Sequence, residues 1–133
     1  MKNKIIDIYP EPNLNVLSEL QTVRYGEIDT KTGELIGQGF TYQGKVFSFS
    51  TSAQANLLGL DLTRNDPALT YPITYNTISD DDTYNVVDAT DMHNMFLTAL
   101  GTKKAHIDSG TALKTQVRNA IDVAAVNLII DNR

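Results

Sequence analysis

The spacing of apolar residues changes along the chain at Asp88. Between residues 23 and 87, apolar residues alternate with polar ones or form short runs bounded by glycine and turn-forming residues, which is typical of short strands. After Asp88 they recur at intervals of three and four residues, which is typical of a helix. The sequence therefore predicts an α+β fold, with small antiparallel β hairpins followed by a C-terminal long helix or helical hairpin that oligomerises.

The first part of the chain predicts an arm and one hairpin. Residues 9–15 carry two prolines and are expected to be extended, whereas residues 13–20 suit a short helix. Within residues 24–37, two segments flank the turn-rich sequence Thr-Lys-Thr-Gly, which predicts a first hairpin. Gly33 is expected to occupy the left-handed position of its loop.

A second hairpin is predicted over residues 40–49, with Gln43-Gly44 as its turn. Phe47 and Phe49 fall on one face of a period-two strand, so we expect both rings in the core rather than on a binding surface.

A short helix and a third hairpin are expected next. The helix covers residues 53–58, with hydroxyl caps from residues 50–52 and an end at Gly59. The hairpin covers residues 71–87 and turns at the acidic sequence 79–82.

The C-terminal region predicts a helix that begins at Asp88, where Asp88 and Asp91 can cap the first turn. Its apolar positions form a seam that we interpret as an oligomer interface. The same register places Lys103, His106 and Gly110 in the middle of the seam. The predicted interface residues are Met92, Phe96, Ala99, Leu113, Val117, Ala120 and Ala124.

This polar middle leaves two alternatives open. The helix breaks near residues 108–110 and forms an antiparallel pair, or a single helix of ~40 residues, about 60 Å long, runs through. A single helix is too long to bury its apolar seam against so small a β layer, so it requires partner chains. Buried polar positions in such a seam select the register of the partners.

The composition of the chain disfavours several classes of protein function. The chain has 133 residues, no cysteine, and a net charge of −5 from 11 basic and 16 acidic residues. It lacks disulfides and thiolate metal sites, and its charge disfavours binding to nucleic acid or to anionic membranes. Asp7 interrupts the first apolar run, which does not resemble a signal peptide, and no apolar run reaches membrane-spanning length.

No residue pattern predicts catalysis, a cofactor or a metal ion. A calcium-binding loop beginning at Asp80 requires glycine at its sixth position, where the chain has Asn85. His93 and His106 lack a second ligand at helical spacing, and the chain has neither GxSxG nor SxxK. We therefore expect that the protein is not an enzyme.

Residues 39–130 resemble a poorly characterised domain family of tailed-bacteriophage tail and tail-fibre proteins. The resemblance is carried by the aromatic hairpin 40–49, the helix sequence 52–59, the strand 71–75 and the passage from turn to helix at 86–91. It implies a β-rich phage tail-type domain over residues 39–87 and a helical oligomerisation region over 88–133. Residues 1–38 lie outside the match and are interpreted as an N-terminal arm and hairpin that docks on a neighbour.

The resemblance implies a structural virion protein of a tailed bacteriophage, made in the host cytoplasm and placed in the tail or fibre region of the virion. Its partners are then other virion proteins and copies of itself, with a trimer favoured over a dimer. The alternative is a tail-fibre assembly chaperone that is absent from the finished particle. A third hypothesis, a small depolymerase, requires converging carboxylates or a metal site, and the sequence nominates neither.

Overall fold

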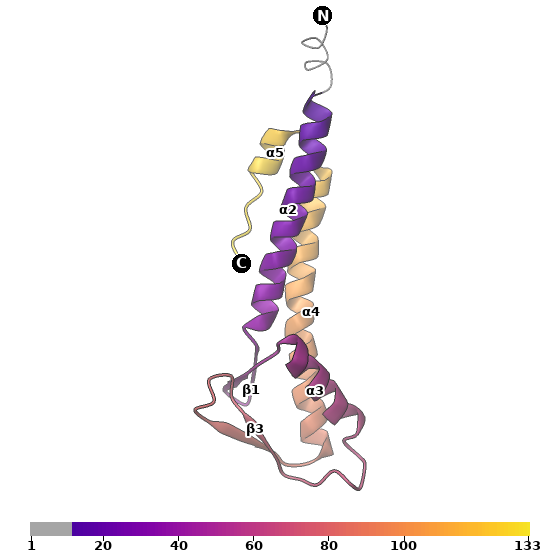
Figure 1. The fold of residues 1–133 in the computed structure, drawn as a ribbon, viewed down its shortest axis with the longest axis vertical. Helices are drawn as coiled ribbons and strands as arrows, with labels where there is room; N and C mark the ends of the chain where they lie inside the picture. Colours follow the sequence, from indigo (N-terminus) through magenta and orange to yellow (C-terminus); the bar gives the residue numbers. More distant parts are fainter. Residues whose placement is uncertain (1–11) are drawn as a thin grey trace, which may run out of the picture. The chain divides into compact units, whose positions relative to one another are not determined.

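The computed structural model describes residues 12–133 and divides the chain into two compact units (Figure 1). Unit 1 contains the described residues up to Thr32 together with Ile107–Arg133, and unit 2 contains Gly33–His106. The predictions for residues 1–11 lie outside the described residues. The elements are α2 (Pro12–Gly37), β1 (Phe40–Tyr42), β2 (Lys45–Phe47), α3 (Thr51–Leu62), β3 (Ile73–Asn76), β4 (Thr83–Val86), α4 (Ala89–Asn119) and α5 (Val123–Asn127). The extended arm predicted over residues 9–15 is wrong for residues 12–15, which form the first turn of the helix α2.

The predicted α+β class is confirmed, with two small antiparallel hairpins and a long C-terminal helix. The predicted first hairpin is wrong, because residues 24–37 belong to the 26-residue helix α2. Leu17, Leu20 and Ile28 are spaced by three and eight residues and pack on one side of this helix. Polar residues between them obscure the helical period in the sequence, and Gly33 lies in the helix with no left-handed backbone.

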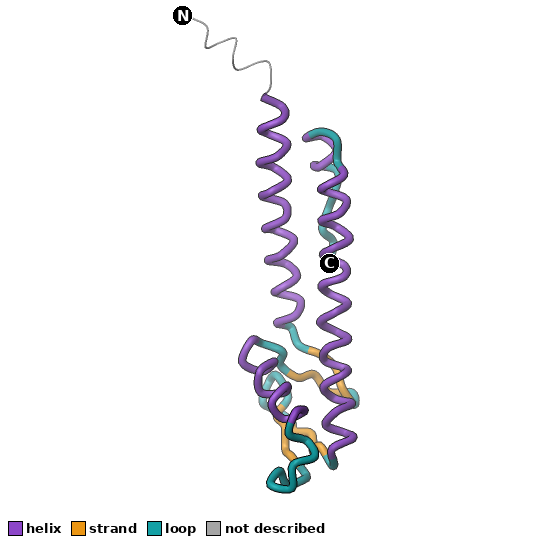
Figure 2. The backbone as a smooth tube through the Cα atoms, turned by 90° about the vertical axis from the view of Figure 1, so that its right-hand side faces the viewer, coloured by secondary structure: helices purple, strands orange, loops and turns teal. Residues whose placement is uncertain are grey.

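Unit 1 is a helical layer around a small apolar core. Residues 107–119 of α4 run antiparallel to α2, and α5 lies beside them (Figures 1 and 2). Ile28, Val117 and Val126 are buried at the centre, one from each helix. Partly buried apolar residues surround them, namely Leu17, Leu20, Tyr25, Leu113, Ala120 and Ile129.

Helix α4 is continuous through the region where a break was one alternative. It spans 31 residues, and the chain leaves the helix only after Asn119, before Asp122 caps α5 through the Ala125 amide at 2.8 Å. The reason given for partner chains, that the apolar seam of a single long helix has too little of its own chain to pack against, is therefore wrong, whereas oligomerisation itself stays a prediction. In unit 1 the seam packs against α2, and in unit 2 it packs against the hairpins.

Gly110, a candidate break point, is instead a point of close packing. A Cβ atom there would lie 2.6 Å from the Thr32 hydroxyl oxygen and 3.2 Å from an Arg133 guanidinium nitrogen. Because glycine has no side chain, Thr32 and Arg133 can lie this close to α4. A second glycine of the same helix, Gly101, has no atom within 4 Å of the equivalent position.

Unit 2 confirms the second and third predicted hairpins. β1 pairs with β2 in the register Phe40 to Phe47, and the turn residues Gln43 and Gly44 have φ of 51° and 74°, as a two-residue hairpin turn requires. β3 pairs with β4 in the register Ile73 to Val86. The nine buried core residues include both predicted phenylalanines and are Phe40, Tyr42, Phe47, Phe49, Leu57, Val86, Met92, Met95 and Ala99.

Helix α3 begins as predicted and ends later than predicted. The Ser50 hydroxyl accepts a hydrogen bond from the Ala53 amide at 3.2 Å, so the cap is confirmed. Gly59 does not end the helix, which continues to Leu62. Leu60 packs against the core and Asp61 is buried, and these inward contacts favour the extra turn.

Candidate functional site: a groove between a helix and an edge strand

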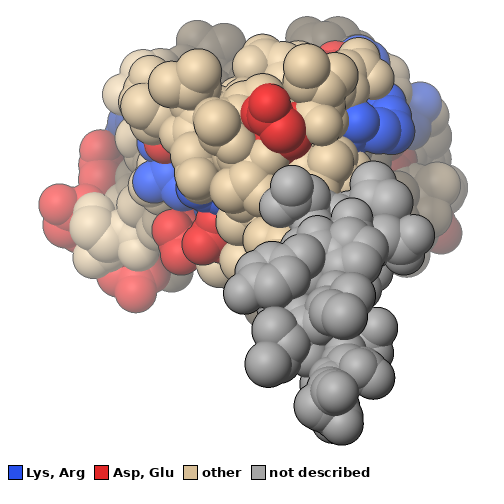
Figure 3. Space-filling model, turned by 90° about the horizontal axis from the view of Figure 1, so that it is seen from above, with Lys and Arg blue, Asp and Glu red and all other residues tan. Residues whose placement is uncertain are grey.

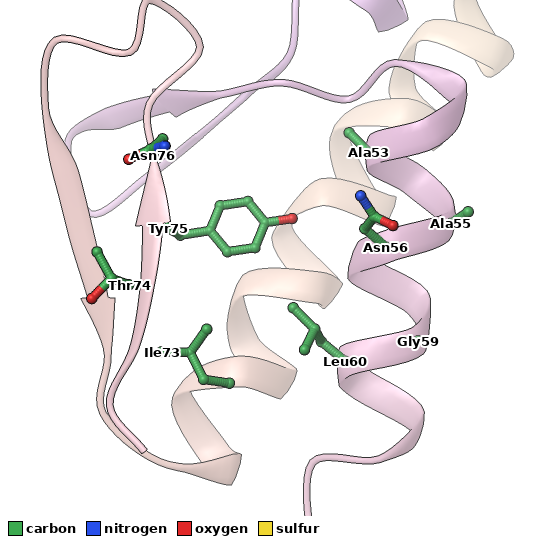
Figure 4. Close-up of a pocket in the computed structure, with 9 residues that line it drawn as sticks. All are labelled: Ala53, Ala55, Asn56, Gly59, Leu60, Ile73, Thr74, Tyr75 and Asn76. Carbon is green, nitrogen blue, oxygen red and sulfur yellow. The ribbon is translucent and has the colours of Figure 1, made fainter. Parts of the chain in front are cut away.

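An open cavity of unit 2 lies between α3 and β3, with a volume of about 700 Å³. Figure 4 shows β3 between β4 and α3, so that the edge of β3 without a strand partner faces the helix across the cavity. We call this cavity the α3–β3 groove. Its lining residues are Ala53, Ala55, Asn56, Gly59, Leu60, Ile73, Thr74, Tyr75 and Asn76.

The ladder between β3 and β4 determines which backbone groups face the groove. The Thr77 amide donates to the Asp82 carbonyl at 3.0 Å, so this pair is hydrogen-bonded. Because opposed residues in an antiparallel ladder alternate between bonded and non-bonded pairs, Thr74 and Asn76 belong to non-bonded pairs. Their amides and carbonyls therefore point away from β4, toward the groove.

An independent contact supports this alternation. Thr83 is opposite Asn76, and the Thr83 carbonyl accepts a hydrogen bond from Lys45 Nζ at 2.7 Å, on the other side of the hairpin. On the groove side, no residue of the described chain donates to or accepts from the backbone of Thr74 or Asn76. The backbone groups of Thr74 and Asn76 are thus without a protein partner in the described chain, whereas the Ile78 amide, beyond the end of β3, donates to the Val46 carbonyl at 2.9 Å.

The walls of the groove combine small, apolar and amide side chains. In Figure 4 the Tyr75 ring crosses the cavity toward α3, where Ala53, Asn56 and Leu60 point back toward it and Ala55 points away. Tyr75 also packs edge-on against Phe47, with ring centroids 5.9 Å apart. Burial raises the pKa of the Tyr75 hydroxyl above its ordinary value of 10.0.

An acidic turn follows β3 directly. Hydrogen bonds from the Ser79 and Thr77 hydroxyls lower the pKa of Asp81, and Lys45, 2.8 Å from Asp82, lowers the pKa of that carboxyl. Asp80, Asp81 and Asp82 are all exposed. The predicted solvated turn between strands is confirmed, and it places negative charge at the end of β3.

Asp91 joins β1, β4 and α4. Its carboxylate accepts hydrogen bonds from Tyr42 Oη, from Tyr84 Oη at 2.8 Å and from the Val87 amide at 3.0 Å. Burial opposes the ionisation of Asp91, but these donors outweigh it and lower the pKa of the carboxyl. Burial and the hydrogen bond to Asp91 raise the pKa of Tyr84 to about 12.

The predicted cap at the start of α4 is also present. The Asp88 carboxylate accepts from the Asp91 amide at 2.8 Å. The sequence pattern indicated this cap and missed the two tyrosine partners of Asp91, because they come from strands distant in sequence.

A second polar group lies at the end of α3, which the sequence did not indicate. Asp61 is buried, with its carboxylate 2.9 Å from His93 Nδ1 and 3.4 Å from an Arg64 guanidinium nitrogen. His93 and Thr90 line an open hollow of about 260 Å³. Such a carboxylate can orient an imidazole as a base, but no hydrogen bond joins the Thr90 hydroxyl to His93 in the described chain.

The predicted interface residues are mostly used for packing inside the chain. Met92 and Ala99 are buried in the core of unit 2 and Val117 in that of unit 1, and Ala124 is exposed on α5. The remaining three, Phe96, Leu113 and Ala120, are partly buried against these cores. An oligomer interface at these positions stays a prediction.

Three of the four most exposed large apolar side chains of the described residues lie in the last part of unit 1. Ile121, Leu128 and Ile130 are 84%, 80% and 65% exposed. On the face shown in Figure 3, basic and acidic side chains are interspersed among uncharged ones, and neither sign covers the described surface alone.

Within residues 12–133, no three His, Asp or Glu side chains meet as a metal-ligand group, and no described helix is both long and apolar enough to cross a membrane. The comparisons with known proteins gave no match to a family model, a curated protein or a solved structure.

Proposed function

We propose that this chain is a structural virion protein of a tailed bacteriophage, a tail, tail-fibre or fibre-attachment subunit that acts by protein–protein assembly. The observation that carries the assembly role is the edge of β3, where the backbone groups of Thr74 and Asn76 point away from β4 and both residues line the α3–β3 groove. Unpaired strand edges are templates for pairing with another chain. The phage context comes from the resemblance of residues 39–130.

The distribution of apolar surface supports the same role. Ile121, Leu128 and Ile130 expose large side chains on one short stretch of unit 1. Grouped exposed apolar residues mark contact surfaces in soluble proteins. In this proposal the chain therefore has partners at two places, at the α3–β3 groove and along residues 121–130. The partners are virion proteins and further copies of the chain, with a trimer favoured over a dimer.

A tail-fibre assembly chaperone is the alternative, and the groove favours it too. A groove that pairs with an extended segment through backbone hydrogen bonds accepts many sequences, which suits transient binding to an incompletely folded fibre chain. The two functions differ in where the chain is found after assembly. A subunit stays in the particle, whereas a chaperone leaves it.

Quantitative mass spectrometry of phage particles and of the lysate that produced them tests the proposal. A subunit gives peptides of this chain in purified particles at a constant ratio to a major tail protein, and the ratio persists through a second purification. Peptides that are present in the lysate and lost from the particles favour the chaperone. Peptides that track neither particle production nor tail assembly contradict both functions.

A further inference from the structure

We propose that the α3–β3 groove binds an extended peptide segment of a partner protein, which is uncharged within the groove and carries lysines at its N-terminal end, beside Asp80. The inference rests on the proposed assembly function and deepens it by naming the chemistry of the partner. All the residues that form this site belong to unit 2, so the site lies within one compact unit.

The backbone of β3 supplies the first part of the recognition. The amides and carbonyls of Thr74 and Asn76 point away from β4, and no described residue binds them. An added strand matches them, because its own amides and carbonyls recur with the same spacing. Pairing stops after Asn76, since the Ile78 amide already donates to the Val46 carbonyl at 2.9 Å. The site therefore takes a short segment, about 13 Å along the four residues of β3.

The length of this edge favours a flexible segment over a second folded copy of the chain. Stable interfaces between folded proteins bury roughly 1,200–2,000 Å². A strand of four residues is too short to supply an interface of that size by itself. The cavity of about 700 Å³ instead falls within the usual range of sites that enclose a ligand, roughly 300–1,000 Å³. An extended peptide can bind there through its backbone.

The side chains of the groove select an uncharged segment. None of the described residues that line the groove is charged, so a charged side chain there would lose water without gaining a counter-ion. Ile73 and Tyr75 point toward α3, and the residues opposite them in an added strand point the same way (Figure 4). An apolar residue opposite Ile73 then meets Leu60. A threonine opposite Tyr75 lies near Asn56.

Two polar side chains of the groove can bind this threonine. The Asn56 side-chain amide and the Tyr75 hydroxyl make no hydrogen bond within the described chain. In Figure 4 both point into the space between α3 and β3. A hydroxyl group both donates and accepts hydrogen bonds, so it can satisfy either partner.

Negative charge beyond the groove gives the segment its direction. In the turn after β3, hydroxyl groups bind the Asp81 carboxylate and Lys45 pairs with Asp82 at 2.8 Å. The exposed Asp80 carboxylate has no partner among the described residues. Antiparallel pairing is the more stable arrangement, and it places the N-terminal end of the segment at the Asn76 end of β3, toward this turn. Lysines at that end therefore pair with Asp80.

Binding of a synthetic peptide to the purified full-length chain tests the proposal, by fluorescence anisotropy. The probe Lys-Lys-Thr-Thr-Thr-Val-Thr places its middle threonine opposite Tyr75 and its valine opposite Ile73. We expect saturable binding, and we expect that replacing both lysines by glutamates weakens it by about tenfold. Absence of saturable binding at protein concentrations up to about 1 mM overturns the proposal.

N-methylation of single peptide amides tests the backbone pairing without a change in the protein. A methyl group on the amide opposite Thr74 removes a hydrogen bond to the Thr74 carbonyl, and binding should weaken by about tenfold. The amide of the preceding residue, opposite Tyr75, points away from β3. Methylation there should change the affinity by less than about threefold. Equal effects of the two methyl groups contradict an added strand on β3.

A matched pair of variants, Ala53→Glu and Ala55→Glu, locates the bound peptide on the protein. Ala53 points into the groove, whereas Ala55 lies on the same helix and points away (Figure 4). Ala53→Glu places a carboxylate in the uncharged groove, so the affinity should fall by about tenfold, with little change for Ala55→Glu. Circular dichroism checks that both variants fold, and the methylated peptides do not depend on either. Equal losses of affinity for the two variants overturn the site.

Asp80→Asn tests the direction of the segment. Asp80 has a φ of 60°, which asparagine also adopts. The affinity for the probe should fall by about threefold, and that for a peptide with its two lysines moved to the C-terminal end should not change. A loss for the second peptide alone, or for neither, contradicts the proposed orientation.

Other results distinguish the occupant of the groove from the function of the chain. If Ala53→Glu lowers self-association of the chain without peptide, in light scattering, a second copy occupies the groove and the peptide partner is wrong. If no peptide binds and the chain is present in phage particles at a constant ratio, the assembly function stands and the site is wrong. If the peptide binds and the chain is absent from particles, the groove stands and the subunit function fails.

Discussion

The two units of this chain are stabilised in different ways. Unit 2 encloses nine buried apolar residues, among them four with aromatic rings, of which Phe40 and Phe49 meet edge to face. Unit 1 encloses three among its described residues and adds polar side chains that bind backbone carbonyls across its helices. The comparison indicates that unit 2 depends on the volume of its core, whereas unit 1 depends on close approach and hydrogen bonding.

Two polar residues of unit 1, Gln21 and Arg133, form hydrogen bonds from one segment of the unit to another. Gln21 donates to the Val117 carbonyl at 3.0 Å, from one helix to the next. Arg133 donates to the Ile28 carbonyl at 3.0 Å and to the Thr32 hydroxyl at 2.9 Å, and it pairs with Asp131 at 2.8 Å. These bonds join the last residues of the chain to α2, where a larger unit would have apolar packing.

The largest effect is expected from truncating the core of unit 2. Phe47 is fully buried and contacts Phe40 and Tyr75. Phe47→Ala should lower the free energy of unfolding by about 3–5 kcal/mol, since it removes a large ring and leaves a cavity. Hydrogen exchange resolved by residue should show the loss of protection mainly in unit 2.

Val46→Ala on the same strand is the control, because Val46 is 42% exposed. We expect a change within about 0.5 kcal/mol for this variant. Equal losses for the two variants would mean that core volume does not determine the stability of unit 2.

A methyl group at Gly110 tests the close approach in unit 1. Gly110→Ala should destabilise the unit by about 1–3 kcal/mol, because Thr32 and Arg133 must move away from α4. Gly101→Ala places the same methyl group in the same helix with no neighbour within 4 Å, and it should raise stability by about 0.5–1 kcal/mol. Thermal unfolding followed by circular dichroism distinguishes the two signs, and stabilisation by both variants contradicts the close packing at Gly110.

Asp91 makes the stability of unit 2 depend on pH in the acidic range. Because the pKa of Asp91 is lower in the folded protein than its ordinary value of 3.8, its contribution is complete above that value and is lost as the pH falls through the folded pKa. Asp91→Asn should cost about 1–2 kcal/mol at pH 7, by loss of a charged acceptor for Tyr42 and Tyr84. The difference between wild type and variant should shrink below about pH 4 in denaturant titrations. A difference that stays constant from pH 7 to pH 2 argues against an ionised Asp91 in the network.

The smallest effect is expected from Gly33, one of the glycines of α2. Gly33 is exposed, and a Cβ atom there would have no neighbour within 4 Å. Gly33→Ala should raise stability by about 0.5–1 kcal/mol, because alanine loses less conformational entropy in a helix. A loss of stability in chemical denaturation would show that this position is not helical in solution and would revive the hairpin predicted from the sequence.

Sequence patterns that depend on neighbouring residues predicted much of the secondary structure of unit 2. The turn Gln43-Gly44 and the cap at Ser50 depend on neighbouring residues, and both are present. Phe47 and Phe49 were predicted to be buried from strand alternation, and both are. The groove itself was not predicted, because α3 and β3 are brought together only by the fold.

The sequence by itself determined the fold class, the central hairpins and the start of α4, because turns, caps and periodicity act over a few residues. Tertiary structure decided that residues 24–37 are helical, since Leu20 and Ile28 gain a buried partner in Val117 that outweighs the weak helix preference of Gly26 and Gly33. It also decided that α4 runs unbroken past Gly110, because α2 and Arg133 pack where a side chain would have been. Contacts between residues about a hundred positions apart, such as that of Arg133 with Thr32, have no local signal in the sequence.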